Sequence, residues 1–339
     1  MGKEHHEPTV PAELPAAETI DPAALLEEWR SGRTDLICVL GPTASGKTRY
    51  AVSLARKLNA LLASSSKPDG MHPDHGECMN PGPVQCEILS GDSRQVYRGM
   101  DIGTGKDLDE YGEIPYHLID IADAGEKYDI YRYQRDFEAA YRGIVERGNL
   151  PILCGGSGLY IEAATCGYNL PDVPPDPALR ERLEKESTEN LITLLASMKK
   201  LHNTTDYDTR KRLVRALEIA FYEKEHPVRR TSYLPKNTFY IGTLVTREER
   251  NARIDRRLDA RLEEGMVEEI RGLLGKVTPE DLMYYGLEYK FVTSYVCGKT
   301  GYDEMRTGLA TAIHQFAKRQ MTWFRGMERK GIRIHWTTV

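Results

Sequence analysis

Short, continuous apolar runs alternate with longer segments of helical periodicity in the first half of the chain. The apolar runs are residues 34–40, 86–91, 116–121 and 150–156, and the helical segments among them are 48–62 and 129–147. Strands of a parallel sheet covered on both faces are apolar throughout, and helices form their crossover connections. The pattern therefore predicts an α/β core with a parallel sheet.

The second half of the chain is mainly helical. Residues 176–226 are helical and strongly charged, and 236–246 return to strand character. From 247 to 327 the pattern is again helical, with breaks near Gly286 and at 298–301. This order predicts a core that is interrupted by a helical insertion.

The expected domain borders follow from these changes of pattern. We expect an acidic arm at 1–33, a core at 34–171, an α-helical insertion at 172–235 and a return to the core at 236–339. The arm is rich in Pro, Ala and Glu, which predicts a disordered or loosely docked segment with one helix around 22–30.

Composition narrows the class of protein. Of 339 residues, 40% are hydrophobic and 29% are charged, as in ordinary globular proteins. No apolar run approaches the roughly 20 residues of a membrane helix, and the polar N-terminus lacks the apolar segment of a secretion signal. The six cysteines stand apart, mostly in apolar stretches, as reduced thiols do. We therefore exclude membrane, secreted and disulfide-scaffold proteins and expect a cytoplasmic location.

The net charge of −5 hides an uneven distribution. Residues 1–30 carry seven acids against two bases, whereas 306–339 carry seven bases against one acid, Glu328. The basic C-terminal segment is suited to contact phosphates. The overall charge favours neither presence nor absence of a nucleic-acid partner.

Residues 41–48, GPTASGKT, fit the pattern G-x-x-x-x-G-K-[ST]. The motif follows a predicted strand and opens a predicted helix, where its glycines can turn backbone N–H groups towards a phosphate. Lys47 is expected to contact the phosphates and the Thr48 hydroxyl to bind Mg²⁺. The predicted phosphate or diphosphate site comprises Gly41, Pro42, Thr43, Ala44, Ser45, Gly46, Lys47 and Thr48.

A nucleotide hydrolase would add an apolar strand that ends in a magnesium-binding Asp. The candidates are weak: Asp120 after HLI and Asp92 after ILSG. Asp92 lies at the edge of the predicted sheet where α/β folds bind ligands, and Ser93, Arg94 and Gln95 follow at once. We expect a general base or a metal ligand at Asp92, although an Asp that caps a helix gives the same pattern.

Six segments together resemble the tRNA dimethylallyltransferase family, also called tRNA isopentenyltransferases, in its bacterial type. They are GPTASGKT (41–48), GDSRQVYRGMDIGTGK (91–106), PYHLIDI (115–121), GGSGLYI (155–161), KRLVRALEI (211–219) and KRQMTWFR (318–325). The resemblance implies a P-loop NTPase-like parallel sheet core with an α-helical insertion domain. It also implies transfer of the dimethylallyl group of dimethylallyl diphosphate to N6 of adenosine 37 in tRNA.

The resemblance assigns catalytic roles to Asp92, Lys47, Thr48 and Ser157. Asp92 takes the general-base position, because a carboxylate can remove a proton from the weakly nucleophilic adenine amine. Lys47, Thr48, Mg²⁺ and the loop amides stabilise the departing diphosphate, which Arg215 also binds. Ser157 keeps the hydroxyl of the family's usual threonine. Such proteins are often labelled ATP-binding because of the loop, although the reaction needs no ATP.

Further segments are assigned to tRNA, whose target base is expected to flip into the pocket. Their residues are Asp92, Ser93, Arg94, Gln95, Ser157, Arg180, Lys211, Arg212, Arg215, Lys318, Arg319, Gln320, Trp323 and Arg325. The expected C-terminal helix adds independent support, since Trp323, Phe324 and Trp336 are interleaved with bases, and aromatic faces stack unpaired nucleotides. The same aromatic residues could instead pack the helix onto the sheet.

The chain departs from the family pattern at two places. An inserted loop at 61–86 contains the metal-ligating residues His72, His75, Cys78 and Cys86. Their spacing matches no standard zinc motif, and the Gly/Pro-rich composition favours a surface loop. In GLEYK (286–290), where relatives have Gly-Tyr-Arg, Tyr289 and Lys290 are the candidate substitutes.

Three other functions compete with this interpretation. A small-molecule P-loop kinase could use Asp92 as base, and an adenylate isopentenyltransferase would prenylate free AMP, ADP or ATP. A non-catalytic binding module would have damaged Lys47, Thr48 or Asp92, and all three are intact. The helical insertion and the basic C-terminus favour tRNA as partner, with no membrane partner, and we expect a monomer.

Overall fold

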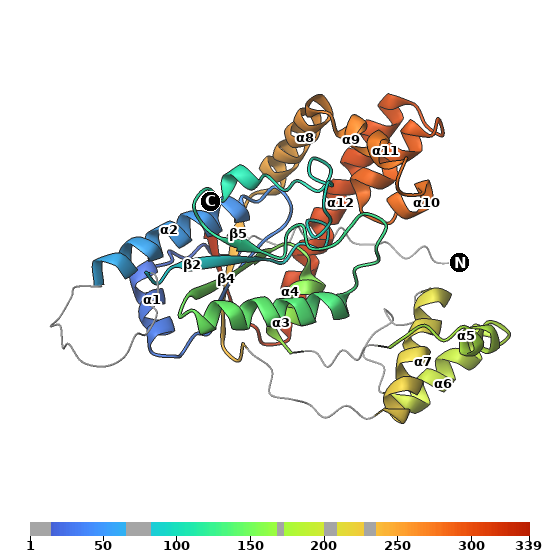
Figure 1. Ribbon diagram of the computed structural model, residues 1–339, viewed down its shortest axis with the longest axis horizontal. Helices are drawn as coiled ribbons and strands as arrows, with labels where there is room; N and C mark the ends of the chain where they lie inside the picture. The colour runs from blue at the N-terminus through green and yellow to red at the C-terminus, as the bar shows by residue number, and fades with distance from the viewer. Residues whose placement is uncertain (1–14, 66–82, 168–172, 200–208, 227–234) are drawn as a thin grey trace, which may run out of the picture. The chain divides into compact units, whose positions relative to one another are not determined.

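The computed structural model describes residues 15–65, 83–167, 173–199, 209–226 and 235–339 (Figure 1). They form two compact units. The core unit comprises the chain up to Cys166 and from Pro235 onward, and the insertion unit spans Gly167–Leu234, compared with the expected 172–235.

One parallel sheet organises the core unit. Its strands are β1 (Leu36–Leu40), β2 (Cys86–Ser90), β3 (Tyr116–His117), β4 (Leu150–Gly155), β5 (Thr238–Leu244) and β6 (Ile334–Thr338), in the order β3-β2-β4-β1-β5-β6. β1, β2 and β4 are buried at every position, as their continuous apolar runs require. Because all strands are parallel, their carboxyl ends meet at one edge, which is where the phosphate loop and Asp92 follow β1 and β2.

Helices cover both faces of this sheet. α1 (Pro22–Arg30) and α2 (Lys47–Ser65) pack on one face, and α3 (Ile130–Glu146) and α4 (Gly158–Thr165) lie on the other, as Figure 1 shows for α2 and α3. Side chains alternate along each strand, so Ile37 and Val39 join Leu25, Leu26 and Leu58 in the core beneath α2. The P-loop NTPase-like fold class predicted from the sequence is confirmed.

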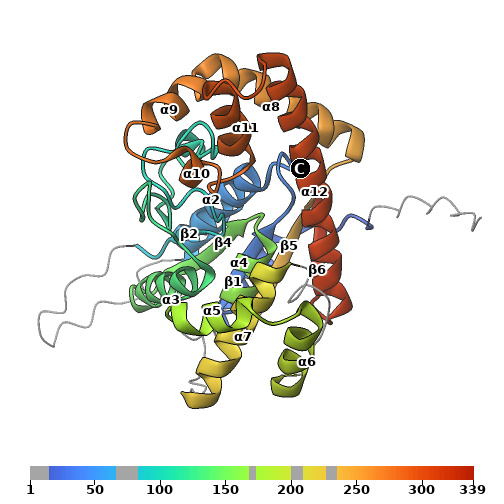
Figure 2. The ribbon, with the colours of Figure 1, turned by 90° about the vertical axis from the view of Figure 1, so that its right-hand side faces the viewer.

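The C-terminal helices stand over the carboxyl edge of the sheet (Figure 2). They are α8 (Arg247–Glu264), α9 (Met266–Leu273), α10 (Pro279–Leu282), α11 (Leu287–Val296) and α12 (Tyr302–Arg329). Thr246 caps α8 by accepting the Glu249 N–H, and Gly265 ends it at φ +114°, a left-handed conformation that favours glycine. The 28-residue α12 packs along α11 and α8 and reaches α4.

The insertion unit has a small core of its own. Its helices are α5 (Pro177–Glu184), α6 (Thr188–Met198) and α7 (Arg210–Glu225). Leu191, Leu195, Leu213 and Leu217 are fully buried where these helices meet. The charged side chains of the sequence pattern therefore occupy the outer faces, as in other amphipathic helices.

Several expected elements differ in the structure. Residues 334–338 form β6 beside β5 and do not continue the C-terminal helix, because α12 ends and Gly331 turns the chain at φ +94°. The expected arm is docked from residue 15 onward, since Leu25 and Leu26 are buried and the Glu18 N–H donates to the Trp336 carbonyl. Of the expected loop 61–86, the first residues belong to α2 and Cys86 belongs to β2.

No helix in the described parts of the chain is long and apolar enough to cross a membrane.

Candidate active site

A cavity of about 420 Å³ opens at the carboxyl edge of the sheet, within the core unit. The segments that follow β1, β2 and β4 contribute to its lining. Side chains of α8, α11 and α12 and of the turn before α11 complete it. Residues far apart in sequence thus share one site, as expected at this edge of an α/β sheet.

The phosphate loop follows β1 and ends at Lys47, where α2 begins. Ala44 at φ +59° and Gly46 at φ +82° adopt left-handed backbone, which directs the loop around the helix N-terminus. A Cβ at Gly41 would lie 2.1 Å from Thr243 Oγ1, so no other residue fits there. Thr243 also donates to the buried Ser45 hydroxyl at 2.6 Å, which ties the loop to β5. The loop has the form of an anion site.

Lys47 and Thr48 both line the cavity. Burial lowers the pKa of the Lys47 amine, and Cys154 and Asp92 oppose that shift. Burial raises the pKa of Cys154 to about 11, so a neutral thiol lies beside the Thr48 side chain. An ammonium group in such a partly desolvated position attracts an incoming anion more strongly than one in bulk water.

Gln320 of α12 joins the phosphate loop to the loop after β4. Its Oε1 accepts the Thr43 N–H at 2.8 Å, and its Nε2 donates to the Gly156 carbonyl at 2.8 Å. The side chain is 7% exposed. Gln320 therefore ties the two loops together through the protein backbone, and its assignment to tRNA stays a prediction.

Asp92 follows β2 directly and lines the cavity. Its Oδ1 accepts the Arg94 N–H at 2.8 Å in a local turn, and no helix of the described chain begins here, so Asp92 is not the helix cap that the sequence also allowed. Ser157, the N-cap of α4, accepts the Ser93 N–H at 3.2 Å. The Asp92 segment is thereby joined to the loop after β4, and all four side chains predicted as catalytic line one cavity.

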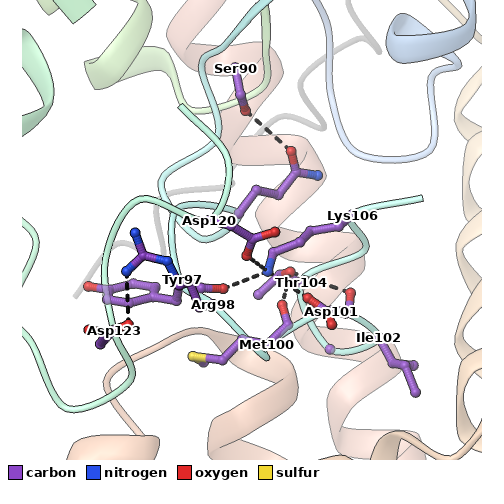
Figure 3. Close-up of polar contacts among 12 residues, drawn as sticks. Ser90, Tyr97, Arg98, Met100, Asp101, Ile102, Thr104, Lys106, Asp120 and Asp123 are labelled. Atoms are coloured by element: carbon purple, nitrogen blue, oxygen red, sulfur yellow. Dashed lines mark hydrogen bonds and ion pairs between the residues drawn. The ribbon is translucent and has the colours of Figure 1, made fainter. Parts of the chain in front are cut away.

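An ion cluster holds the segment that follows Asp92 (Figure 3). The buried Lys106 ammonium donates to the Tyr97 carbonyl at 2.6 Å, pairs with Asp101 at 2.6 Å and also contacts Asp120. Gln95 spans the same segment, because it accepts from Ser90 Oγ at 3.2 Å and donates to the Gly105 carbonyl at 3.0 Å. Asp120 therefore pairs with Lys106, and it is not among the residues that line the cavity.

Two arginines stack on aromatic rings beside the cavity. The Arg94 guanidinium lies 5.6 Å from the Tyr284 ring centroid, and that of Arg319 lies 5.8 Å from the ring of Phe316. Tyr284 is 50% exposed and Phe316 37%, and all four side chains line the cavity. Exposed aromatic and guanidinium planes of this kind are suited to stack unpaired bases.

The aromatic residues of the expected C-terminal helix have different environments. Trp323 is 39% exposed and packs against Gly158, where a Cβ would lie 2.3 Å from its ring. Phe324 is fully buried, and Trp336 lies in β6, 2% exposed, against Gly242. Of the three, only Trp323 can stack a base. Of the other predicted tRNA residues on α12, Lys318 is exposed and Arg325 half-buried.

Arginines of α8 were missed in the sequence. Arg257 and Arg261 line the cavity, and the Arg253 guanidinium approaches to 3.9 Å of a Cβ placed on Gly46. Burial lowers the pKa of Arg261, as does its neighbour Arg257, against the opposing effect of Asp107. Their spacing could have indicated a shared role, because arginines four residues apart lie on one face of a helix.

The insertion unit holds the other predicted cations. Arg180 donates to both carboxylate oxygens of Glu218 (3.0 and 2.9 Å), and Arg215 contacts Glu218 and the Val173 carbonyl. Burial alone would raise the pKa of Glu218, but these hydrogen bonds lower it to about 2. Lys211 and Arg212 are exposed on α7. The assignment of these residues to tRNA and diphosphate stays a prediction.

The structure describes part of the two segments that depart from the family pattern, the turn 286–290 and the inserted loop 61–86. Tyr289 is buried and donates to Glu269 at 2.7 Å, whereas Lys290 is exposed and lines the cavity. Cys86 is buried in β2, which removes it from the candidate zinc set, and His72, His75 and Cys78 lie outside the described residues. Among the described residues, no group of His, Cys, Asp or Glu forms a metal cluster.

Comparison with known proteins agrees with this geometry. The family model described as IPP transferase matches residues 95–327. The chain is 54% identical over 306 residues to a tRNA dimethylallyltransferase of Porphyromonas gingivalis, covering 89% of this chain and 93% of that protein. It is 44% identical over 308 residues to one of Trichlorobacter lovleyi, covering 90% and 92%.

Solved structures give the same result. The tRNA isopentenylpyrophosphate transferase of Bacillus halodurans superposes with a TM-score of 0.59 at 32% identity, covering 90% of this chain and 89% of that one. That of Staphylococcus epidermidis gives 0.57 at 28% identity, covering 89% and 92%. A eukaryotic dimethylallyltransferase, 23% identical and covering 89% and 74%, shares the fold with a TM-score of 0.67. This chain belongs to the IPP transferase family.

Proposed function

We propose that this protein transfers the dimethylallyl group of dimethylallyl diphosphate to N6 of adenosine 37 in tRNA. One observation carries the proposal: a single cavity is lined by the phosphate loop, by Asp92 and by arginine–aromatic pairs. The loop suits a diphosphate, and the stacked pairs suit unpaired bases. The carboxylate of Asp92 lines the same cavity and can serve as the proton acceptor there.

The reaction uses each part of the cavity in turn. The loop amides and Lys47 bind the diphosphate, where negative charge grows as the allylic C–O bond breaks. The adenine amine forms the new N–C bond, and its proton passes to the Asp92 carboxylate. Ser157, which accepts the Ser93 N–H, orients the segment that carries Asp92. The products are N6-dimethylallyladenosine and diphosphate.

The residues present fit a magnesium ion. Thr48 offers one hydroxyl at the start of α2, and the described residues hold no acidic cage. Mg²⁺ commonly takes few protein ligands and completes its shell with phosphate oxygens and water. When bound, the ion supplies positive charge to the leaving diphosphate. Thr48 is therefore its proposed protein ligand.

The proposal includes a cytoplasmic monomer. Five cysteines in the described parts of the chain are free, as in a reducing compartment. A tRNA acceptor is also encountered in that compartment.

The test is transfer of labelled dimethylallyl diphosphate to an unmodified tRNA with adenosines at positions 36 to 38, with AMP as a parallel acceptor. We expect prenylated adenosine at position 37 by nucleoside mass analysis, and inert AMP. Labelled AMP with unchanged tRNA would assign the same chemistry to a free nucleotide. No transfer to either acceptor would contradict the proposal.

A further inference from the structure

Glu288 is an acidic side chain in a cavity whose other charged residues, apart from Asp92, are cations. It lies in the first turn of α11, after Gly286, whose φ of +141° only glycine adopts readily. A Cβ at Gly286 would be 3.7 Å from both Glu288 Oε2 and Arg94 Nε. The turn at Gly286 therefore leads into a helix whose Glu288 lines the same cavity as Arg94, which stacks on Tyr284.

No other side chain satisfies this carboxylate. Across the described residues, Glu288 has no hydrogen bond or ion pair to another side chain, although its own backbone N–H contributes one. The nearby arginines are engaged elsewhere, since Arg257 donates to Asp107 at 2.5 Å and Arg261 at 3.4 Å. Burial raises the pKa of Glu288, which Arg261 and Arg257 oppose. Such a group gains from an external hydrogen-bond donor.

The chemistry of the two proposed substrates indicates which of them supplies the hydrogen-bond donor to Glu288. An allyl diphosphate consists of hydrocarbon and anionic oxygens, so it offers a carboxylate only repulsion. RNA carries base amines and 2′-hydroxyl groups, and both donate hydrogen bonds. The amine of the target adenine is already the partner of Asp92 in the proposed reaction. Glu288 is then matched to a neighbouring donor on the same RNA.

We infer that Glu288 is a specificity-determining residue that accepts a hydrogen bond from a base amine or a 2′-hydroxyl group next to the target adenosine. The inference rests on the proposed function and adds a recognised group to it. A site with a buried acceptor discriminates strongly against an analogue that lacks the donor, because the acceptor is then left unpaired. Glu288 thus selects among RNA substrates, whereas the phosphate loop binds dimethylallyl diphosphate, which is the same for every RNA.

The experiment compares the full-length wild type with Glu288→Gln on anticodon stem-loop RNAs at saturating dimethylallyl diphosphate. One RNA is unmodified, one series carries a single 2′-deoxy substitution at successive loop positions, and another replaces each neighbouring adenosine by purine riboside. Glu288→Gln keeps an acceptor oxygen but loses the charge, so we expect kcat/KM for the unmodified RNA to fall about fivefold, the difference between a charge-assisted and a neutral hydrogen bond. The KM for dimethylallyl diphosphate should stay unchanged.

The modified RNAs identify the donor. One substitution, either a 2′-deoxy position or a deleted amine, should lower kcat/KM about 25-fold in the wild type but only about fivefold in Glu288→Gln. Equal losses in both enzymes for every RNA would overturn the inference. A raised KM for dimethylallyl diphosphate with unchanged RNA discrimination would also overturn it, because Glu288 would then position Arg257 and Arg261.

Two controls keep the result interpretable. Glu264→Gln removes the same charge from an exposed position at the end of α8, outside the cavity, and should leave all rates unchanged. If Glu288→Gln does not fold, the wild-type profile alone decides, since a flat response to every modification contradicts the inference. Failure of the wild type to modify any RNA would contradict the proposed function itself, which is a separate outcome.

Discussion

The cavity has two walls that are built in different ways. The wall that we propose to bind the diphosphate, here called the phosphate wall, belongs to one continuous segment, residues 41–48. Its proposed binding groups are mainly backbone amides at the start of α2. The acceptor wall combines the segment after β2, the turn before α11 and one face of α12. Its binding groups are side chains: a carboxylate, guanidinium groups and aromatic rings.

This difference separates what each wall can recognise. Backbone amides bind any suitably placed phosphate oxygen, so the first wall recognises a class of anion. Side chains read shape, hydrogen-bond donors and stacking faces, so the second wall can be selective among RNAs. Substitutions in the two walls should therefore have separable kinetic effects, one on the allyl donor and the other on the acceptor.

The largest effect is expected at Asp92, where the walls meet. Asp92→Asn keeps the shape and the contact to the Arg94 N–H but removes the proton acceptor. We expect kcat to fall about 1,000-fold, within the range for general bases, while the Kd for tRNA changes less than about threefold. Single-turnover transfer and filter binding measure the two quantities.

Asp109→Asn, on the exposed 3₁₀ turn Leu108–Glu110, is the matched control and should be silent. A collapse of tRNA binding with near-normal kcat would make Asp92 a recognition residue. It would contradict the assignment of Asp92 as the general base.

Lys47 tests the phosphate wall alone. Lys47→Ala removes the buried ammonium, so kcat/KM for dimethylallyl diphosphate should fall about 100-fold, while tRNA affinity is retained. Lys57→Ala, exposed on the same helix, serves as the control. If the variant instead loses tRNA and keeps its KM for the allyl donor, the assignment of the loop to the diphosphate is wrong.

The fold was largely predictable because its signals are local. Continuous apolar runs gave β1, β2 and β4, and periodicity gave α2 and α3 to within a few residues. β6 (IHWTT, 334–338) was missed because it follows a basic helix closely and is only five residues long. The run 116–121 gave only Tyr116–His117 as strand, since Leu118 and Asp120 adopt positive φ that no sequence pattern announced.

The site residues were predictable from the sequence only where they lie together in one continuous motif. The phosphate loop and Asp92 stand in continuous motifs, and both line the cavity. Gln320 and Phe324 stand in an equally clear motif, yet they are buried and structural, because helix orientation depends on tertiary packing. Glu288 and the arginines of α8 enter the cavity from helices whose placement could not be read from spacing alone.

Gln320 links the walls, so its loss should affect both. Gln320→Leu keeps the volume but leaves the Thr43 N–H and the Gly156 carbonyl without their partner. We expect stability to fall by about 2 kcal/mol and kcat/KM for both substrates to fall about 10-fold. Urea unfolding and steady-state kinetics measure these effects, with the exposed Gln315→Leu on the same helix as control. An effect on one substrate only would show that the walls are independent of this link.

The smallest effect is expected at Tyr284, at the exposed end of the acceptor wall. Tyr284→Leu keeps apolar bulk but removes the ring beneath Arg94, so tRNA affinity should fall about fivefold, the lower range for a stacked base. The KM for dimethylallyl diphosphate and the salt dependence of tRNA binding should not change, because stacking neutralises no phosphate. Tyr302→Leu, at a similarly exposed position (44% against 50%) outside the cavity, should be silent. A change in the KM for dimethylallyl diphosphate at Tyr284 would mean that the two walls do not act separately.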